Sequence, residues 1–431
     1  MNLVNGKVIN SEECERVLEN IDEMLISTLR KTPLDVEKVI HACDCMVQNA
    51  EQLDIIKKLP ELGISPVLTS MYIGQVKSML GADAIKRRLK IELGENYNKP
   101  QELVYAHSGA KAAQTLAPLG VLFHITAGNV DGLPFISLLD GLFTGNINIV
   151  KLPKQEGGIT VSLLLELFKI APELQEYVYV FDYSSKDLHA MRKLAKVANA
   201  IVVWGGDEAV SAVRRLAEPN TKIIEWGHKI SFAYVTKSGA KNTTLLEKLA
   251  MNICLTNQLF CSSCQGIFID TDNMDEVYKF CEEFLAILER ISAVHPFAFD
   301  EAAMIFIKAG ATLQFYHERI ERSENKVFKG NDCSVTACRD SKLEPSMQYR
   351  NVWVKPLNRD DIINLRGYKN YLQTAALICS DDEYTELAEK LIRAGIIKVS
   401  DGFEMSSYAL GEGHDGEFTL RCYTRVVSVQ N

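Results

Sequence analysis

The residues with the clearest capacity for covalent chemistry lie in the middle of the chain, around Cys261. Apolar residues at helical spacing precede this cysteine, from Leu245 to Ile253, and a strand-like run from Gly266 to Ile269 follows it. A thiol on a turn between a helix and a strand can face a cleft and act as a nucleophile. The competing interpretation is a small buried side chain, because free cysteine is among the most buried residue types.

The spacing of Cys261 and Cys264 permits two further interpretations, a redox pair and one half of a zinc site. A closed zinc site needs two more ligands, and the best candidates, Cys333 and Cys338, lie far along the chain. The chain has 11 cysteines, an odd number, and they are scattered. This arrangement favours reduced thiols over a disulfide framework, and no metal site is predicted.

Three segments before this cysteine have residue types that suit the binding of a cofactor. The small-residue loop 126–131 and the pair Gly205-Gly206 each follow a predicted strand and lead into a helix, whose first N–H groups could bind an anion. Neither segment matches a known glycine-rich phosphate loop, so ordinary tight turns are the alternative. Lys151 and Lys154 close a strand before a glycine pair and could contact phosphate, although most surface lysines are simply solvated.

The elements that must position these residues change in kind along the chain. Residues 11–94 carry Leu, Ile and Val at steps of three and four, which predicts helices, either as a lead-in to the next domain or as an independent module. From residue 103, short apolar strands alternate with amphipathic helices, which predicts a mostly parallel sheet that binds ligands at the carboxyl ends of its strands. Strands are predicted at 120–125, 147–152, 177–181, 200–204, 223–226, 232–235, 266–269, 353–354, 374–379 and 396–399, and helices at 133–142, 158–170, 187–197, 207–217, 275–292, 300–309 and 382–394.

The end of the chain has a different pattern. Residues 417–429 alternate polar and apolar side chains for most of their length, which predicts one long strand. An exposed strand at a chain end is a liability unless it pairs with another strand. We therefore expect this strand to pair between subunits.

Composition limits the class of protein. The 431 residues, 47% hydrophobic and 24% charged, suit a globular protein of two or three domains. A net charge of -9 without a Lys/Arg block makes nucleic acid an unsuitable partner. Residues 1–20 lack the apolar core of a signal peptide, and no run of about 18 apolar residues occurs, so we expect a cytoplasmic protein without membrane insertion.

Taken in order along the chain, these segments resemble a known enzyme superfamily. The sequence is similar to the aldehyde dehydrogenases and, within them, to the LuxC-type acyl-CoA reductases, the reductase component of fatty-acid reductases. The similarity runs from about Leu116 to the end of the chain. The segments that carry it are 127–130, Lys151, 205–206, 225–229, 257–261, 368–374 and 413–421.

The resemblance implies an α/β, aldehyde dehydrogenase-like fold: a Rossmann-type parallel-sheet cofactor domain, an α/β catalytic domain and a bridging oligomerisation element. Members of the superfamily dimerise through that element, so a homodimer or tetramer is expected. The implied domains are a helical N-terminal part of the cofactor domain at 1–102, a bridging segment at 103–119, the nicotinamide cofactor-binding domain at 120–235, the catalytic domain at 236–400, and a return to the cofactor domain with the oligomerisation strand at 401–431.

The reaction that the resemblance implies is the NADPH-dependent reduction of a long-chain fatty acyl-CoA or other acyl thioester to the aldehyde, through an acyl-enzyme on Cys261. By similarity, the Asn129 amide and the Cys261 N–H would stabilise the carbonyl oxygen. The alternative is oxidation of an aldehyde to an acid or acyl-CoA, because Glu225 matches the general base of hydrolytic relatives. In a reductase, Glu225 would point away, help to deprotonate Cys261, or leave residual thioesterase activity. A non-catalytic scaffold protein is a third hypothesis.

The resemblance also implies the cofactor. In the superfamily, the lysine at the end of this strand, matched by Lys151, contacts the adenine ribose. NAD-preferring members often carry Glu at the position of Lys154. A cation at that position would attract a 2′-phosphate, which predicts NADPH. The other cofactor contacts implied are Thr126, Ala127, Pro153, Gly205, Gly206, Trp226 and Gly227.

The remaining expectations concern the substrate and the partners. Gln258, His228 and His414 are expected near the substrate, and Cys264 is expected only to pack. The substrate would be an acyl-CoA or an acyl-protein. A LuxE-like acyl-protein synthetase is the expected protein partner.

Overall fold

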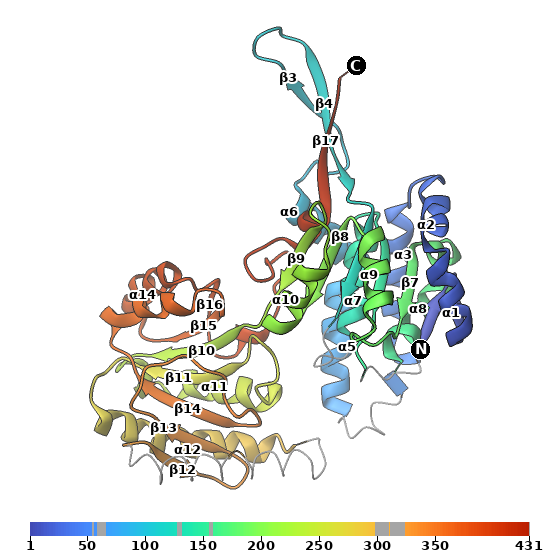
Figure 1. Cartoon of the computed structure of the whole chain (residues 1–431). Coiled ribbons are helices and arrows are strands. Elements are labelled where there is room, and N and C mark those ends of the chain that lie inside the picture. Colours follow the sequence, from blue (N-terminus) through green and yellow to red (C-terminus); the bar gives the residue numbers. More distant parts are fainter. Residues whose placement is uncertain are drawn as a thin grey trace. The chain divides into compact units, whose positions relative to one another are not determined.

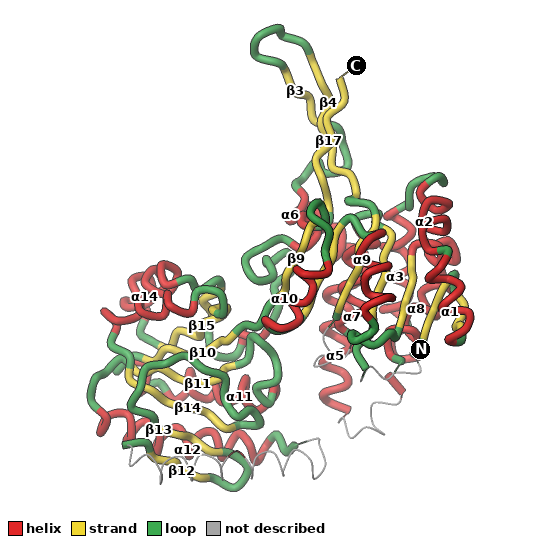
Figure 2. Tube along the Cα trace, viewed as in Figure 1, coloured by secondary structure: helices red, strands yellow, loops and turns green. Residues whose placement is uncertain are grey.

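The computed structural model describes residues 1–53, 56–57, 66–126, 132–154, 158–297, 310 and 324–430. The chain forms two compact units, the first made of Met1–Gly227 and Ala409–Asn431 and the second of His228–Tyr408. Each unit combines a largely parallel sheet with helices, as Figures 1 and 2 show. The predicted α/β class is confirmed.

The first unit is built on a seven-stranded sheet with the order β2-β1-β7-β6-β5-β8-β9. The last five strands in this order are parallel, and most of their residues are buried. Near-continuous apolar runs are typical of parallel strands that are covered on both faces, which is why the sequence located them closely. The strands are β1 (Asn2–Val4), β2 (Lys7–Ile9), β5 (Val121–Ile125), β6 (Ile147–Lys151), β7 (Val178–Phe181), β8 (Ala200–Trp204) and β9 (Lys222–Trp226).

The N-terminal helices belong to this unit and are not an independent module. Leu18 and Ile21 share one core cluster with Phe123 of the sheet, and Val39 shares a second cluster with Phe135. The α-helices described in residues 1–227 of this unit are α1 (Ser11–Glu19), α2 (Ile21–Leu29), α3 (Val36–Gln48), α5 (Pro66–Leu80), α6 (Ala82–Leu93), α7 (Leu133–Phe143), α8 (Ile159–Ile170), α9 (Leu188–Val197) and α10 (Asp207–Leu216).

A separate three-stranded antiparallel sheet has the order β17-β4-β3. It contains β3 (Gln101–Val104), β4 (Lys111–Pro118) and β17 (Thr424–Gln430), and β17 pairs with β4 of the same chain from Thr424↔Pro118 to Gln430↔Ala112. The prediction of one long strand over 417–429 is wrong in its first half, because residues Thr419–Cys422 form the short helix α15. Leu420 is buried in that helix, and its N–H donates to Oε2 of Glu92 in α6 at 2.8 Å.

The second unit is built on another seven-stranded sheet, with the order β12-β13-β14-β11-β10-β15-β16. All neighbours in it are parallel except β12 and β13. The strands are β10 (Ile230–Val235), β11 (Cys264–Ile269), β12 (Lys326–Lys329), β13 (Ser334–Ala337), β14 (Asn351–Pro356), β15 (Leu372–Ile378) and β16 (Lys398–Ser400).

Helices cover both faces of the second sheet. Residues of α11 (Thr243–Thr256) and α12 (Met274–Val294) share one core cluster with the sheet, and residues of the 3₁₀ segment η5 (Arg359–Tyr368) and α14 (Asp381–Ala394) share another. The predicted helix at 300–309 lies outside the described residues. Among the helices that the structure describes, none combines the length and the apolar character that crossing a bilayer requires.

The boundaries between the units differ from those implied by the resemblance. Strand β10 pairs with β11 and β15, so residues 230–235 belong to the second sheet and not to the first. The chain changes unit between Gly227 and His228, where the sequence predicts residue 235, and returns at Ala409, where it predicts residue 401.

Candidate active site

Cys261 lies in the turn between α11 and β11, and its side chain is exposed. Two consecutive residues in the left-handed region, Asn257 (φ 47°) and Gln258 (φ 61°), end α11 and turn the chain toward the cysteine. Asn tolerates this conformation better than most residues, whereas Gln adopts it at a cost. Gln258 is buried, and a hydrogen bond from its Nε2 to the carbonyl of Cys264 at 3.0 Å helps to hold this conformation.

Side chains from neighbouring segments hold the cysteine turn. The hydroxyl of Ser231 donates to the carbonyl of Cys261 at 2.7 Å, and the hydroxyl of Ser406 donates to the carbonyl of Ser262 at 3.0 Å. Nε2 of Gln373 lies 3.5 Å from Sγ of Cys261. The thiol is therefore exposed while the backbone that carries it is fixed, as a nucleophile requires.

Cys264 is buried, whereas Cys261 is exposed. It begins β11, it is fully buried, and burial raises the pKa of its thiol to about 12. Its Sγ–H donates to the carbonyl of Gly266 at 3.3 Å. A resolving thiol must be accessible, so the redox-pair interpretation does not fit, and the expectation that Cys264 packs is confirmed. Across the described ranges, no three His, Cys, Asp or Glu side chains gather as metal ligands.

Arg350 is a buried cation behind the cysteine turn, and the sequence analysis missed it. Its guanidinium donates to the carbonyls of Cys254 and Ser292 at 3.3 Å and of His295 at 2.6 Å. These carbonyls lie at the C-terminal ends of α11 and α12, where partial negative charge gathers. Burial lowers the pKa of the guanidinium, and hydrogen bonds to helix ends compensate for its lost solvation.

Arg350 also joins two left-handed segments of backbone. Gln348, Tyr349 and Arg350 all have positive φ, at 59°, 48° and 67°. The N–H of Tyr349 donates to the carbonyl of Asn257 at 2.9 Å, and Nε of Arg350 donates to Oδ1 of Asn257 at 3.3 Å. Three such residues in a row are costly and persist only where the surroundings enforce them. No local signal in the sequence marks this arrangement, because its parts come from three distant segments.

The predicted cofactor residues that the structure describes lie at the carboxyl edge of the first sheet. Lys151 ends β6, and Thr126 follows β5 and donates to the carbonyl of Lys151 at 3.2 Å. Burial lowers the pKa of the Lys151 ammonium, and no described residue forms an ion pair or hydrogen bond with it. Lys154 is exposed, and Pro153 is half-buried. Asn129 and Ala127 lie outside the described residues.

Aromatic rings gather at the ends of the next two strands. Trp204 ends β8 and Trp226 ends β9, with ring centroids 5.6 Å apart. His414 lies 5.1 Å from the first ring and 5.0 Å from the second. The structure thus brings His414 to Trp226.

The double glycine that follows Trp204 makes a close turn. A Cβ added at Gly205 would approach Cβ of Ala209 to 3.0 Å, so glycine allows the turn to pack against α10. Gly206 is the N-cap of α10, whose first turn carries Asp207 and Glu208. These carboxylates already complement the positive end of the helix, so this turn is a weaker anion site than the end of β6.

Glu225 lies in β9 and is held in an ion pair. Nε of Arg214 donates to its Oε1 at 2.6 Å, and Nη2 donates to its Oε2 at 2.8 Å. Both carboxylate oxygens are thus engaged by a cation, which opposes their use as a proton acceptor. Gly227 is the last residue of the first unit before the chain crosses, and the exposed His228 is the first residue of the second.

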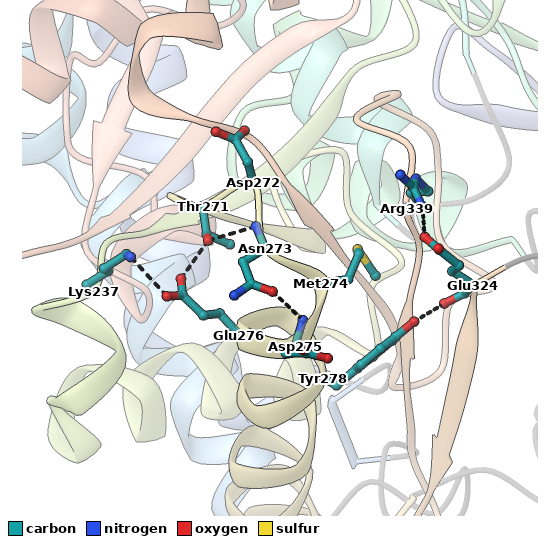
Figure 3. A pocket seen from close by; sticks show the side chains of 10 residues that line it. All are labelled: Lys237, Thr271, Asp272, Asn273, Met274, Asp275, Glu276, Tyr278, Glu324 and Arg339. Atoms are coloured by element: carbon teal, nitrogen blue, oxygen red, sulfur yellow. Dashed lines mark hydrogen bonds and ion pairs between the residues drawn. The ribbon is translucent and has the colours of Figure 1, made fainter.

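A cavity of about 600 Å³ lies at the carboxyl edge of the second sheet, on the side of β11 opposite to Cys261 (Figure 3). Among its lining side chains, Lys237 pairs with Glu276 at 3.0 Å, and Arg339 pairs with Glu324. Thr271 donates to Glu276 at 2.5 Å. Because the thiol of Cys261 is not part of its lining, we do not regard this cavity as the active site.

Comparison with solved structures defines the class. Two α/β units, with a cysteine turn before the central strand of the second sheet, form an aldehyde dehydrogenase-like fold. An NADP-dependent glyceraldehyde-3-phosphate dehydrogenase from Bacillus halodurans aligns with a TM-score of 0.72 at 14% identity, over 100% of this chain and 98% of that one. Lactaldehyde dehydrogenase from Escherichia coli aligns with a TM-score of 0.66 at 14% identity, over 97% and 89%.

The chain belongs to the acyl-CoA reductase (LuxC) family, whose family model matches residues 32–426. Two relatives are long-chain acyl-protein thioester reductases. The one from Aliivibrio fischeri is 22% identical over 320 residues, which cover 72% of this chain and 64% of that protein. The one from Photobacterium phosphoreum is 21% identical over 372 residues, covering 85% and 74%. The match thus spans less than two thirds of the Aliivibrio protein.

Proposed function

We propose that this protein reduces a long-chain acyl thioester, an acyl-CoA or an acyl-protein, to the aldehyde with NADPH. The observation that carries the proposal is the exposed thiol of Cys261 on a turn whose backbone is fixed by Ser231 and Ser406. Membership of the LuxC family and the thioester reductase activity of the two relatives support the same chemistry.

The thiolate of Cys261 attacks the acyl carbon, and the bond to the carrier sulfur breaks as the carrier leaves with the electron pair. The backbone N–H of Cys261, and by similarity the amide of Asn129, would donate to the carbonyl oxygen as it gains charge. A bound nicotinamide supplies a hydride to the acyl carbon. With a proton taken from solvent, this step would give a hemithioacetal on Cys261. Its hydroxyl proton then returns to solvent, the carbon–sulfur bond breaks with its electron pair going to sulfur, and aldehyde leaves.

The end of β6 fits a nicotinamide dinucleotide. The half-desolvated ammonium of Lys151, without a partner among the described residues, would gain from ribose hydroxyl or phosphate oxygens. Thr126, Pro153, Trp226 and Gly227 would complete this site. The exposed Lys154 would favour a 2′-phosphate, so we propose NADPH. Steady-state kinetics in which NADH is used as efficiently as NADPH would contradict this choice.

Oxidation of an aldehyde to an acid is the second candidate, and Glu225 motivates it. The bidentate pair with Arg214 weakens that reading, because a carboxylate that already accepts two hydrogen bonds from a cation is a poor base. Assays in both directions separate the candidates. Aldehyde consumption without dependence on CoA would favour oxidation.

Mass spectrometry after incubation with an acyl-CoA, but without reductant, tests the covalent step. We expect an acyl adduct on the Cys261 peptide that NADPH discharges as aldehyde, and no adduct in Cys261→Ala. Cys338→Ser, which changes a half-buried thiol of the same unit, is the control and keeps the adduct. An adduct at another residue, or an unchanged adduct in Cys261→Ala, would refute the proposal.

Assembly is also proposed. Within the described residues β17 pairs only with β4, and its Val426 and Val429 are 49% and 51% exposed. We expect this strand to contribute to a homodimer or tetramer, and Val426→Lys with Val429→Lys to dissociate it in light scattering. An acyl-protein synthetase that delivers acyl groups would suit a substrate of the acyl-protein type.

A further inference from the structure

The carboxamide of Gln373 lies against the reacting sulfur. Its Nε2 is 3.5 Å from Sγ of Cys261, and the side chain belongs to a residue that is only 7% exposed. An amide N–H can only donate, and sulfur can accept. The contact therefore favours the sulfur when it carries negative charge, since hydrogen bonds to ionised acceptors are the stronger ones.

An irregularity in the sheet coincides with this contact. Ile230 of β10 pairs with Leu372 of β15, but Phe232 pairs with Ala375. One residue of β10, Ser231, thus faces two residues of β15. Such bulges re-aim side chains and are frequent beside active sites. The register between β10 and β11 shifts at the same level, between Ser231 and Ala233.

Ser231 joins the bulge to the cysteine turn. Its hydroxyl oxygen accepts from the N–H of Thr374 at 3.1 Å, and the hydroxyl donates to the carbonyl of Cys261 at 2.7 Å. The N–H of Thr374, in the bulge, therefore orients the hydroxyl of Ser231, which in turn holds the backbone of Cys261. Ser231 is fully buried. Its hydroxyl contacts both the carbonyl of Cys261 and, at 3.4 Å, Oε1 of Gln373, so one fixed residue positions both.

We propose that Gln373 is a catalytic residue of the reductase, donating to the Cys261 thiolate before attack and again as the hemithioacetal collapses. The proposal rests on the proposed function. In the first step the thiol proton leaves to solvent and the N–H stabilises the remaining charge. In the last step the hydroxyl proton goes to solvent, the carbon–sulfur bond breaks, and its electron pair returns to sulfur. The same N–H of Gln373 then donates to the new thiolate.

The test is the pH dependence of Cys261 alkylation by iodoacetamide, measured on its peptide by mass spectrometry. Gln373→Met keeps the shape and removes the donor, and we expect its midpoint to rise by about one pH unit, which is about tenfold less thiolate below the midpoint. Gln373→Glu places a carboxylate beside the sulfur and raises the midpoint further. The Cys45 peptide of the same sample serves as an internal reference.

Gln265→Met is the matched control, because Gln265 is a buried glutamine of the adjoining strand β11 whose carboxamide contacts Ser346 and the carbonyl of Gln258. Its midpoint is expected to stay at the wild-type value. Unchanged midpoints in both Gln373 variants, or an equal shift in Gln265→Met, would overturn the proposal. Alkylation needs no substrate, so a shifted midpoint in a protein that forms no acyl adduct would refute the function and not the role of Gln373 at the sulfur.

Discussion

In the first sheet the candidate cofactor residues follow the carboxyl ends of the parallel strands, whereas in the second sheet Cys261 precedes the central strand. Gln373 and Ser231 likewise lie near the beginnings of β15 and β10. The two sheets have the same number of strands and similar cover by helices, yet they present their chemistry at opposite edges. Under the proposed function, the rule that open parallel sheets bind ligands at their carboxyl ends would hold for the first sheet and not for the second.

The difference follows from which charges the protein already satisfies. At the carboxyl edge of the second sheet, Arg359 donates to Asp270 and Glu383, each at 2.7 Å. The fully buried ammonium of Lys355 donates to Asp340 at 2.8 Å and to Glu344 at 2.6 Å. At the carboxyl edge of the first sheet, Lys151 has no such partner among the described residues. The cations at the two carboxyl edges thus differ in whether the described residues pair them.

The largest effect is expected where the amino edge of the second sheet depends on a buried cation. Arg350→Met removes the donor shared by the ends of α11 and α12 and leaves their carbonyls buried without partners. We expect the free energy of unfolding to fall by about 3 kcal/mol, measured by chemical denaturation. Arg366→Met, which changes an exposed arginine, should stay within about 0.5 kcal/mol. Equal free energies of unfolding of the two variants would mean that Arg350 does not stabilise the amino edge of the second sheet.

The carboxyl edge of the first sheet is tested by Lys151→Met. Loss of the cation that ends β6 should weaken NADPH binding by about 10- to 100-fold, or about 1.4 to 2.8 kcal/mol, in a fluorescence titration. Lys169→Met, in which a surface lysine paired with Glu166 is changed, is the control and should bind as the wild type does. Unaltered affinity in Lys151→Met would mean that the cofactor does not bind at the end of β6. The proposed difference between the carboxyl edges of the two sheets would then be wrong.

The contribution of the carboxyl edge of the second sheet to the free energy of unfolding should depend on pH. Burial acts to raise the pKa of Glu383, but hydrogen bonds from Ser238, Arg359, Ser380 and Thr236 outweigh it and lower that pKa to about 2. A depressed folded-state pKa gives stability above the unfolded value of 4.5 that is lost as pH falls toward 2. Glu383→Gln should therefore cost about 1 to 2 kcal/mol at pH 7 and less below pH 4.5, in denaturation series.

The control for that series is Glu386→Gln, which changes an exposed carboxylate of the same helix. Its free energy of unfolding should stay within about 0.5 kcal/mol of the wild-type value. Glu383→Gln should also leave the alkylation of Cys261 unaltered, because this edge is structural. A changed alkylation rate would show that the two edges are coupled.

The smallest effect concerns Glu225. Arg214→Gln frees both of its oxygens, and we expect the fraction of acyl-enzyme released as free acid to rise a few-fold, measured as the ratio of acid to aldehyde. Arg215→Gln, the exposed neighbour on α10, should leave the ratio at its wild-type value. An unchanged ratio in Arg214→Gln would exclude Glu225 as a latent base.

The sequence was most informative where the structure is local. Buried parallel strands such as β5 and β6 are continuous apolar runs, so their positions could be predicted closely, and the cysteine turn was marked by its break between a helix and a strand. By contrast, β1 has only two apolar residues and pairs with β7 from far along the chain. Burial of Leu420 against α6 overrode the alternating pattern of the tail.

The residues that hold the cysteine turn could not be predicted, because their contacts also come from distant parts of the chain. Arg350 matters because two helices end beside it, and Gln373 because a bulge directs it toward Cys261. Both facts depend on the register and packing of segments more than 90 residues apart, as the separations of 96 and 112 residues from their contacts show. A single sequence records the nucleophile but not the framework that positions it.

The second unit is an uninterrupted stretch, His228–Tyr408, inserted into a first unit that is incomplete without residues 409–431. The N–H of Leu420 reaches Glu92 across 328 residues, and β17 must find β4 over a similar separation. On the ribosome, the second unit can therefore fold before residues 409–431 are made, while the first unit has to wait for them. A chain that stopped at residue 408 would contain a complete second unit and a first unit without β17 and α15.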